Sequence, residues 1–444
     1  MEDDLKWSRY NRLFESEKYG HLIYNSLTNS FAELNPETYR EIEKIRDNPR
    51  DYDYSNKPGL FLQLLQAKIM VGAEEEKDLI NVRRLHFNYQ QYSTDNLYLT
   101  VAPTTNCNFK CPYCYEQIEK GQNMSLEIEE ALLTFIQRFQ PLSRLNIFWY
   151  GGEPLLKFDT IIRITEKILD WDLSYHASMV TNGYLLNDHV ISELDNLKIK
   201  LIQVTIDGNE DTHNSRRRLK NGKGSYHQIL ENLDRLMDSW DGFLQVRVNV
   251  DGSNTEEFVD VYQQINDRYN NNNKIKVYPG IIDDINETNP EVSCQINREE
   301  EIKFYLQLYQ QYGIRVHKFY PQQENVGCIA SARNAFLIGP VGEVYKCWDD
   351  VGDEEKIIGN IENRKSWNNR LLSRYIIGAD LYEDERCQDC FYLPVCDGGC
   401  SKKRVVNRYE GKKQDHCLVF KDHLEEMLEI YYGIKHQKKS AVGV

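Results

Sequence analysis

The chain has 444 residues, 41% of them hydrophobic, which is enough for two or three folding units with cores of their own. Its formal net charge of −15 disfavours nucleic acid as a substrate, because the basic runs Arg216–Arg218 and Lys402–Arg404 are too short to offset repulsion by a phosphate backbone. The first residues are polar and acidic, and no run of about eighteen apolar residues follows, so the sequence predicts a cytoplasmic protein without a membrane partner.

The first 95 residues predict a small unit of strands and helices. Two short apolar runs, at residues 22–24 and 31–34, read as strands joined by a polar turn. Asn35 followed by Pro36 is a typical cap and first turn, and predicts a helix that continues through Ile45. A second apolar stretch predicts a helix from Leu60 to Val71.

Six apolar runs alternate with helix-length amphipathic stretches in the middle of the chain. This alternation predicts successive strand and helix units around a parallel sheet or barrel. Behind a Ser125 cap, Leu132, Phe135, Ile136 and Phe139 recur with the period of a helix. The predicted strands are Leu97–Val101, Leu145–Tyr150, His176–Val180, Lys200–Ile206, Leu244–Val250 and Ile275–Tyr278.

All but one of the eleven cysteines fall into two groups, and Cys294 stands apart. Thiols gathered in this way in a reducing compartment are more typical of metal ligands than of disulfides. Cys107, Cys111 and Cys114 form the first group, in the segment TNCNFKCPYCYE after the first predicted strand. Three thiolates can hold three irons of a [4Fe–4S] cube and leave the fourth iron open. The alternative is a zinc site, although structural zinc normally takes four ligands.

The CxxxCxxC spacing, with the aromatic Tyr113 before the third cysteine, resembles the radical S-adenosylmethionine (SAM) superfamily. Members of that family bind the amino group of SAM at a GGE turn that ends the second strand. Gly151, Gly152 and Glu153 occupy that position here. Two glycines allow a close approach of the backbone, and the carboxylate supplies charge for an ammonium. Taken alone, the same residues would be only a turn between a strand and a helix.

The resemblance extends to the ends of the following strands. Asn182 closes the third strand and Asp207 closes the fourth, at the carboxyl ends where barrel folds bind ligands. An arginine that follows a histidine in this family pairs with a carboxylate, and Arg217 is the positional match. Without the family pattern, Arg217 would be assigned to a solvated basic face. We therefore expect Tyr113, Gly151, Gly152, Glu153, Asn182, Asp207 and Arg217 to bind the cofactor.

The second cysteine group resembles the SPASM pattern, CX9-15GX4C, a gap, CX2CX5CX3C, a gap and C. The resemblance implies two auxiliary [4Fe–4S] clusters, and three cubes in all. Some relatives have a further cysteine where Gln322 stands, so either Cys294 completes the proximal cube or its fourth position is open. A zinc ribbon over residues 387–400 is the alternative. The implied ligands are Cys387, Cys390, Cys396 and Cys417 for the distal cube, and Cys328, Cys347 and Cys400 for the proximal one.

Together these features predict an α/β fold, with a partial (β/α)6 radical SAM barrel at residues 96–285. Residues 1–95 resemble the winged-helix-like recognition domain of peptide-maturing enzymes, with a packing extension as the alternative. A bridging region covers 286–327, and a cysteine-rich SPASM domain covers 328–420. The remaining residues, 421–444, form a tail, and a last helix is predicted from Phe420 to Tyr432.

The resemblance implies a radical SAM oxidoreductase that cleaves SAM reductively to a 5′-deoxyadenosyl radical and removes a hydrogen atom from a peptide. The expected partners are a ribosomally made precursor peptide, with its leader on the N-terminal domain, and an electron donor such as flavodoxin or ferredoxin. The expected product is an intramolecular thioether or carbon–carbon cross-link.

Two other functions stay open. In the sulfatase-maturating relatives an aspartate base directly follows the cysteine that corresponds to Cys347. Here Trp348 stands there, and Asp349 one residue later is the candidate acid–base residue. The third possibility is a noncatalytic iron–sulfur or zinc protein that binds peptides.

Overall fold

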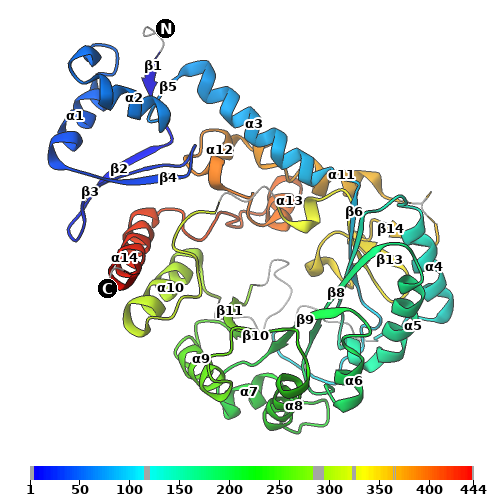
Figure 1. The fold of residues 1–444 in the computed structure, drawn as a ribbon. Helices are drawn as coiled ribbons and strands as arrows, with labels where there is room; N and C mark the ends of the chain where they lie inside the picture. The colour runs from blue at the N-terminus through cyan, green and yellow to red at the C-terminus, as the bar shows by residue number, and fades with distance from the viewer. Residues whose placement is uncertain are drawn as a thin grey trace.

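The computed structural model describes residues 5–114, 121–283, 295–322, 327–363, 365 and 367–442. Its centre is a nine-stranded sheet in the order β11-β10-β9-β8-β7-β6-β12-β13-β14. The six strands from β6 to β11 are neighbours in chain order, and every adjacent pair among them is parallel. These strands form an open arc with helices on its outer side (Figure 1). The predicted α/β fold with a mostly parallel central sheet is therefore confirmed.

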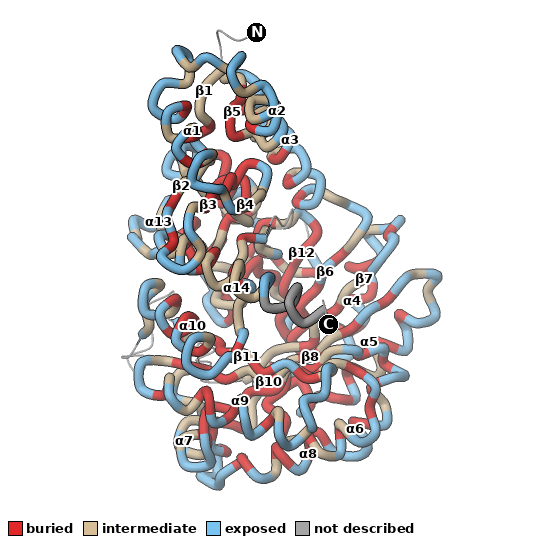
Figure 2. Tube along the Cα trace, turned by 60° about the vertical axis from the view of Figure 1, so that its left-hand side comes forward, coloured by how far each residue is buried: buried red, intermediate tan, exposed pale blue. Residues whose placement is uncertain are grey.

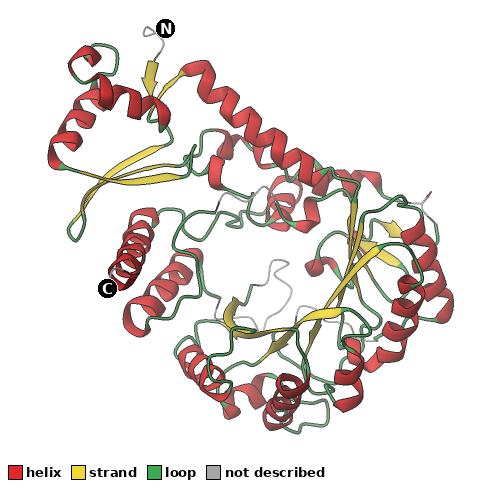
Figure 3. Ribbon diagram, viewed as in Figure 1, coloured by secondary structure: helices red, strands yellow, loops and turns green. Residues whose placement is uncertain are grey.

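Each of the six predicted apolar runs lies within or overlaps a parallel strand. Alternate residues of β7 show why: Leu145, Ile147 and Trp149 are buried against the helices, whereas Phe148 faces the other side of the sheet. Figure 3 shows the strands as a continuous band. The strands are β6 (Asn96–Val101), β7 (Arg144–Trp149), β8 (Ser174–Thr181), β9 (Ile199–Thr205), β10 (Phe243–Val250) and β11 (Ile275–Ile281).

The helices between these strands bury one apolar stripe each on the sheet. In α4 (Leu126–Gln137) the predicted cap is confirmed, since the Ser125 side chain accepts a hydrogen bond from the Ile128 amide. Figure 2 shows the buried residues along the strands and the exposed ones on the outer helices. The other helices are α5 (Phe158–Leu169), α6 (Asp188–Glu193), α7 (Glu210–Arg216), α8 (Tyr226–Ser239) and α9 (Glu257–Arg268).

The second cysteine region extends the same sheet. β12 (Ala335–Ile338) pairs parallel with β6, and β13 (Glu343–Tyr345) and β14 (Gly359–Asn360) follow in antiparallel pairing. The first cysteine loop follows β6 directly, so this pairing brings the two cysteine regions to the same part of the fold. Farther along the chain lie α11 (Asn369–Ile376), α12 (Glu385–Gln388) and α13 (Ser401–Glu410).

The N-terminal unit contains a three-stranded antiparallel sheet of β2 (Asn11–Ser16), β3 (Gly20–Asn25) and β4 (Ser30–Leu34). The next element, α1 (Pro36–Asp47), confirms the predicted cap, because the Asn35 side chain accepts from the Thr38 amide. The predicted helix to Val71 was too long. Instead α2 (Pro58–Gln66) ends before Lys68, whose positive φ of 57° breaks the helix, and β5 (Met70–Gly72) pairs with β1 (Leu5–Trp7).

Two long helices connect the parts of the molecule, and the sequence had predicted only the second of them. α3 (Ala73–Gln91) runs from the N-terminal unit to the barrel (Figure 1). The last helix, α14 (Leu424–Val442), begins later and ends later than predicted, and it packs Leu424 and Leu428 against Leu22 and Tyr24 of the N-terminal sheet. α10 (Arg298–Tyr312) packs on the barrel. Cys294 lies outside the described residues.

No helix in the described part of the chain has both the length and the apolar character that crossing a membrane requires.

Candidate active site

The loop that carries Cys107, Cys111 and Cys114 leaves the carboxyl end of β6 and is fixed by backbone hydrogen bonds to the segment after α7. Lys110 N donates to Arg218 O (3.0 Å) and Lys220 N donates to Asn108 O (2.9 Å). All three thiols are partly buried. Burial raises the pKa of Cys107 to about 11. A neutral thiol of this kind becomes a thiolate ligand only where a cation compensates the charge, which fits an iron site.

Gly151 and Gly152 pack directly against this loop. A Cβ on Gly151, which has φ of 113°, would lie 2.3 Å from Thr104 O, and one on Gly152 would lie 2.4 Å from Asn106 O. Gly152 N donates to Thr104 O (3.1 Å). The sequence suggested that the two glycines admit a ligand. Their immediate neighbour in the protein is the backbone of the cysteine loop, so they fix the loop against the end of β7. Their contact with SAM stays a prediction.

Glu153 is completely buried beside the loop. Its carboxylate accepts hydrogen bonds from Thr181 Oγ1 (2.7 Å), Asn182 N (2.8 Å) and Leu155 N (3.1 Å). Burial raises its pKa to about 6, and these donors limit the rise. A nearby cation stabilises the charged form of such a buried carboxylate, and the ammonium group of SAM is a cation of this kind.

Asn182 and Asp207 take different positions around the loop. Asn182 Nδ2 donates to Asn108 Oδ1 (2.7 Å) and lies 3.9 Å from Cys107 Sγ, so its side chain contacts the cysteine loop. Asp207 accepts a short hydrogen bond from the Tyr113 hydroxyl and another from Asn249 N (3.2 Å). The side chain of Tyr113 is therefore anchored to the ends of β9 and β10.

Arg217 completes the network and keeps one donor available. Its NH1 donates to the Tyr113 hydroxyl (2.8 Å), and the guanidinium lies 5.7 Å from the centre of the Phe109 ring. Its Nε is buried and has no hydrogen-bond partner among the described residues. A buried guanidinium donor without a partner is costly, and a ligand carboxylate would satisfy it. Glu153 and Arg217 thus fit the two charged ends of an amino acid, the group that SAM presents.

His213 is connected through Ser225 to the backbone of Arg217, a role that the sequence did not reveal. Nδ1 of His213 accepts from Asp207 N (3.3 Å), so the proton is on Nε2, which donates to Ser225 Oγ (3.0 Å). Ser225 in turn donates to Arg217 O (2.7 Å). Burial and the Arg217 charge lower the pKa of His213 to about 3, which keeps the ring neutral.

Three members of the second cysteine group lie near one another. Cys400 is within electrostatic range of both Cys328 and Cys347. The Cys347 thiol also donates to Asp349 Oδ2 (3.5 Å). Burial raises the pKa of the Asp349 carboxyl. Asp350 has a purely structural environment, since it is buried against Lys402 and accepts from the Tyr375 hydroxyl (2.5 Å).

Trp348 links the second cysteine region to the barrel interior. Its ring centre lies 4.3 Å from that of Tyr150 and 5.1 Å from that of Phe148, on the face of β7 that points away from the outer helices. Tyr150 is in turn within electrostatic range of Cys114 and Asp349. Asp349 therefore lies at the side of the barrel where the first cysteine loop is.

The other four cysteines lie together farther from the barrel. Cys387 and Cys396 influence each other's charge, and Lys421 is within range of both Cys390 and Cys417. Lys421 Nζ lies 3.6 Å from Cys417 Sγ. Arg386 is within electrostatic range of both Cys387 and Cys417, which places members of this set near one another.

Comparison with known proteins identifies the central domain. Residues 101–265 match the family model of the radical SAM superfamily. A cysteine-type anaerobic sulfatase-maturating enzyme from Clostridium novyi (strain NT) is 23% identical over 368 residues, which cover 74% of this chain and 95% of the relative. A serine-type enzyme from Bacteroides thetaiotaomicron is 23% identical over 367 residues, covering 71% of this chain and 85% of the relative.

Solved structures share the fold. Native anSMEcpe with bound AdoMet superimposes with a TM-score of 0.59 and 18% identity, over 76% of this chain and 100% of that one. Streptococcus suis SuiB bound to precursor peptide SuiA superimposes with a TM-score of 0.55 and 12% identity, over 94% of this chain and 99% of that one.

Proposed function

The protein is a radical SAM enzyme, and from this premise we propose that it installs an intramolecular thioether or carbon–carbon cross-link in a ribosomally made precursor peptide. Cys107, Cys111 and Cys114 hold a [4Fe–4S] cluster that, with SAM bound, supplies a 5′-deoxyadenosyl radical. Glu153 binds the ammonium of SAM and Arg217 binds its carboxylate, and together they orient the cofactor on the cysteine loop.

The other cysteines hold two auxiliary [4Fe–4S] clusters in this proposal. Their chemistry supports the assignment: thiols gather in two sets, with Lys421 and a backbone amide on the sulfurs of individual members. Clusters held by these residues would supply an acceptor for the electron that the substrate radical loses as the cross-link closes. A flavodoxin or ferredoxin supplies the electron that starts the reaction. The proximal set is Cys328, Cys347 and Cys400, and the distal set is Cys387, Cys390, Cys396 and Cys417.

The observation that favours cross-linking is the extent of the structural match. The sulfatase-type structure is covered completely but leaves about a quarter of this chain unmatched, whereas SuiB with its precursor peptide matches 94% of it. The N-terminal unit described above has about the length of the unmatched part. An additional domain suits a substrate that binds through a segment distant from its reacting residues. The leader of a precursor peptide is such a segment.

Two surfaces of the N-terminal unit suit a leader. β4 is an edge strand of its sheet, and Ala32 and Glu33 in its middle are exposed, so the leader can add as a further strand. Helix α3 exposes Val82, Leu85 and Tyr89 at helical spacing, with Tyr89 65% exposed. Contiguous exposed apolar side chains are typical of interaction sites.

We accordingly assign residues 1–95 to leader binding and 96–285 to the radical SAM core. The bridging region is 286–327, the SPASM domain with the auxiliary clusters is 328–420, and the C-terminal helix and tail are 421–444.

Sulfatase maturation is the second candidate. It is favoured by relatives that cover most of this chain, a cysteine-type and a serine-type anaerobic sulfatase-maturating enzyme. In that reaction Asp349 would act as the acid–base residue in place of the aspartate that Trp348 replaces. Its position beside Cys347 and near Tyr150 leaves it at the barrel interior, whereas Asp350 is held by Lys402 and Tyr375. We therefore assign proton transfer in either reaction to Asp349.

A direct test separates the candidates. The anaerobically reconstituted full chain is incubated with SAM, a reductant and a candidate short precursor peptide chosen from the open reading frames near its gene, and the products are analysed by mass spectrometry. Cross-linking predicts the loss of two hydrogens and a fragmentation gap between the joined residues. Conversion of a sulfatase peptide Cys or Ser to an aldehyde, with the short peptide unchanged, would favour the second candidate. The Cys107→Ala variant serves as the inactive control, and a wild type that cleaves no SAM would point to a noncatalytic peptide-binding protein.

A further inference from the structure

Arg404 is an arginine whose three nitrogens are all held in place inside the second cysteine region. Its side chain is only 5% exposed. Nε donates to Gly398 O (2.7 Å), NH1 donates to Asp384 Oδ2 (2.7 Å), and NH2 lies 3.2 Å from Cys387 Sγ. Arg404 belongs to the short basic run Lys402–Arg404, of which Lys402 and Arg404 are both buried. Such burial of a guanidinium needs a specific reason.

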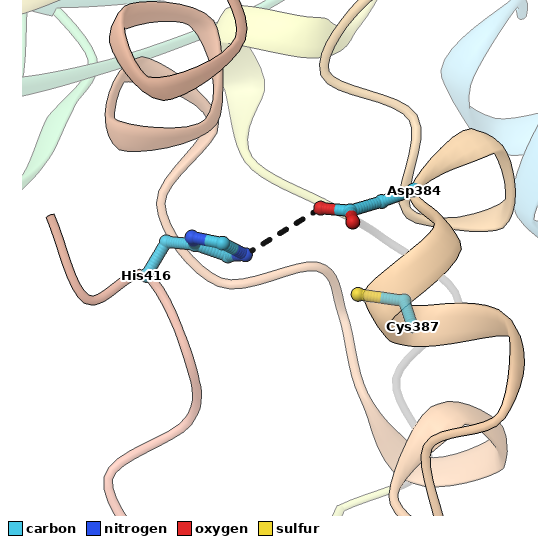
Figure 4. A group of neighbouring side chains, drawn as sticks. All are labelled: Asp384, Cys387 and His416. Atoms are coloured by element: carbon cyan, nitrogen blue, oxygen red, sulfur yellow. Dashed lines mark ion pairs between the residues drawn. The ribbon is translucent and has the colours of Figure 1, made fainter. Parts of the chain in front are cut away.

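The neighbours of Arg404 include a group that resembles a metal site. Asp384, Cys387 and His416 place their ligand atoms within 4.8 Å of one another, and Figure 4 shows the three side chains turned toward a common centre. The Asp384 carboxylate, however, already accepts from Arg404, and from Arg386 through Nε (3.1 Å) and NH2 (2.9 Å). Two guanidinium groups at that centre repel a divalent cation. Asp384, Arg386 and Arg404 therefore form a charged clamp around the Cys387 sulfur, and this clamp does not favour a separate metal ion.

Helix α13 ties this clamp to the other cysteine set. Cys400 caps the helix, and its sulfur accepts from Lys403 N (3.5 Å). Arg404 follows one turn later and reaches Cys387. One short helix thus carries a donor to the sulfur of a proximal ligand and a donor to the sulfur of a distal ligand.

We propose that Arg404, held by Asp384, is a positioning residue that raises the reduction potential of the distal auxiliary cluster through its contact with Cys387 Sγ. This inference rests on the proposed function, since it takes Cys387 as a cluster ligand. A reduced cube carries one more negative charge than an oxidised one, and a buried cation that donates to a ligand sulfur stabilises the reduced form. The distal cluster is thereby a better electron acceptor than it would be without the Arg404 contact.

The test is a potentiometric titration followed by electron paramagnetic resonance on the full chain. Cys107→Ala, Cys111→Ala and Cys114→Ala are combined as a background, so that only auxiliary clusters contribute. Arg404→Gln is expected to shift the midpoint potential of one auxiliary cluster to more negative values. Arg404→Lys, which keeps the charge but loses the rigid fork, is expected to give a smaller shift in the same direction.

Arg408→Gln is the matched control, because Arg408 lies one turn farther along α13 and donates to Gly378 O instead of to a sulfur. Its potentials should equal those of the background. A merely structural role predicts the opposite sign for Arg404→Gln, since water admitted to a loosened cluster stabilises the reduced form.

An unchanged or more positive potential in Arg404→Gln, with full iron content, overturns the inference. If that variant loses its distal cluster, the Arg404→Lys variant is used instead: a more negative potential supports the inference, and an unchanged or more positive one overturns it. A background protein that contains no auxiliary cluster at all would instead contradict the cluster assignment of the proposed function.

Discussion

At the residue scale, the site depends on charges and close contacts that are only balanced when a ligand is present. Glu153 is buried with three hydrogen-bond donors, and Arg217, whose charge acts on it, has a buried Nε without a hydrogen-bond partner among the described residues. Both groups lie beside the loop of Cys107, Cys111 and Cys114. An amino acid with free ammonium and carboxylate groups would compensate both at once.

SAM binding should depend on pH through Glu153. Burial raises its pKa to about 6 in the free site, so the carboxylate is charged above that pH and neutral below it. The ammonium binds the charged form, and affinity should therefore be full at about pH 7.5 and fall up to about tenfold per pH unit below about pH 6. Anaerobic calorimetry on the iron-loaded enzyme measures this. Glu153→Gln should bind weakly with no pH step, and a wild type without a step would refute the assignment.

Gly152→Ala should dislodge the first cluster. The new Cβ would meet Asn106 O at 2.4 Å and Thr105 O at 2.6 Å, and both are backbone atoms of the cysteine loop that cannot rotate away. We expect the variant to fold but to lose about a third of its iron and its SAM cleavage, as measured by iron analysis and 5′-deoxyadenosine formation. Gly59→Ala, where nothing lies within 4 Å, is the control. Full iron content in Gly152→Ala would show that the loop tolerates the change.

At the element scale, the strand and helix alternation of the barrel was predictable because each strand buries one face and each helix one stripe. Ser125 and Asn35 marked helix starts correctly because their side chains have to satisfy free amides. The end of α2 was not predictable, since a positive φ at Lys68 carries no sequence signal. Long-range partners such as Asn249 and His213 were also missed, because a polar residue next to a strand does not show which loop it meets.

The exposed face of α3 should contribute to leader binding. Combined Leu85→Glu and Tyr89→Glu substitutions place charge on side chains that are 48% and 65% exposed, so they should leave folding intact. We expect leader affinity to fall at least about tenfold, as removal of apolar anchors commonly does. Fluorescence anisotropy of a labelled leader measures this. Leu169→Glu on α5, 40% exposed, is the control, and equal affinity in all three proteins would rule α3 out.

At the scale of the whole molecule, the sheet brings both cysteine regions together. β12 pairs with β6, and Trp348 packs on Tyr150, so the proximal set lies beside the barrel. Cys387 and Cys396 of the distal set pack instead in a separate cluster with Phe87 of α3. The family resemblance implied this division of ligands, but it did not show how α13 would connect the sets. The N-terminal sheet is joined to the rest through α3 and α14.

Removing one ligand set should remove one cluster and leave the others. Replacing Cys387, Cys390, Cys396 and Cys417 together by alanine should lower iron content by about a third while SAM cleavage persists, because the first site is untouched. Iron and sulfide analysis with Mössbauer spectroscopy measures the loss. Iron content unaffected by the replacement would mean that these residues are not cluster ligands.

The most direct measurement is the electron paramagnetic resonance spectrum of the reduced, anaerobically prepared full chain before and after addition of SAM. Binding of SAM at the open iron of a cube held by Cys107, Cys111 and Cys114 predicts a changed cluster signal in the wild type, followed by formation of 5′-deoxyadenosine. Neither should occur in Cys107→Ala. A wild type that contains no iron cube in this loop, or whose signal is the same with and without SAM, would contradict the account.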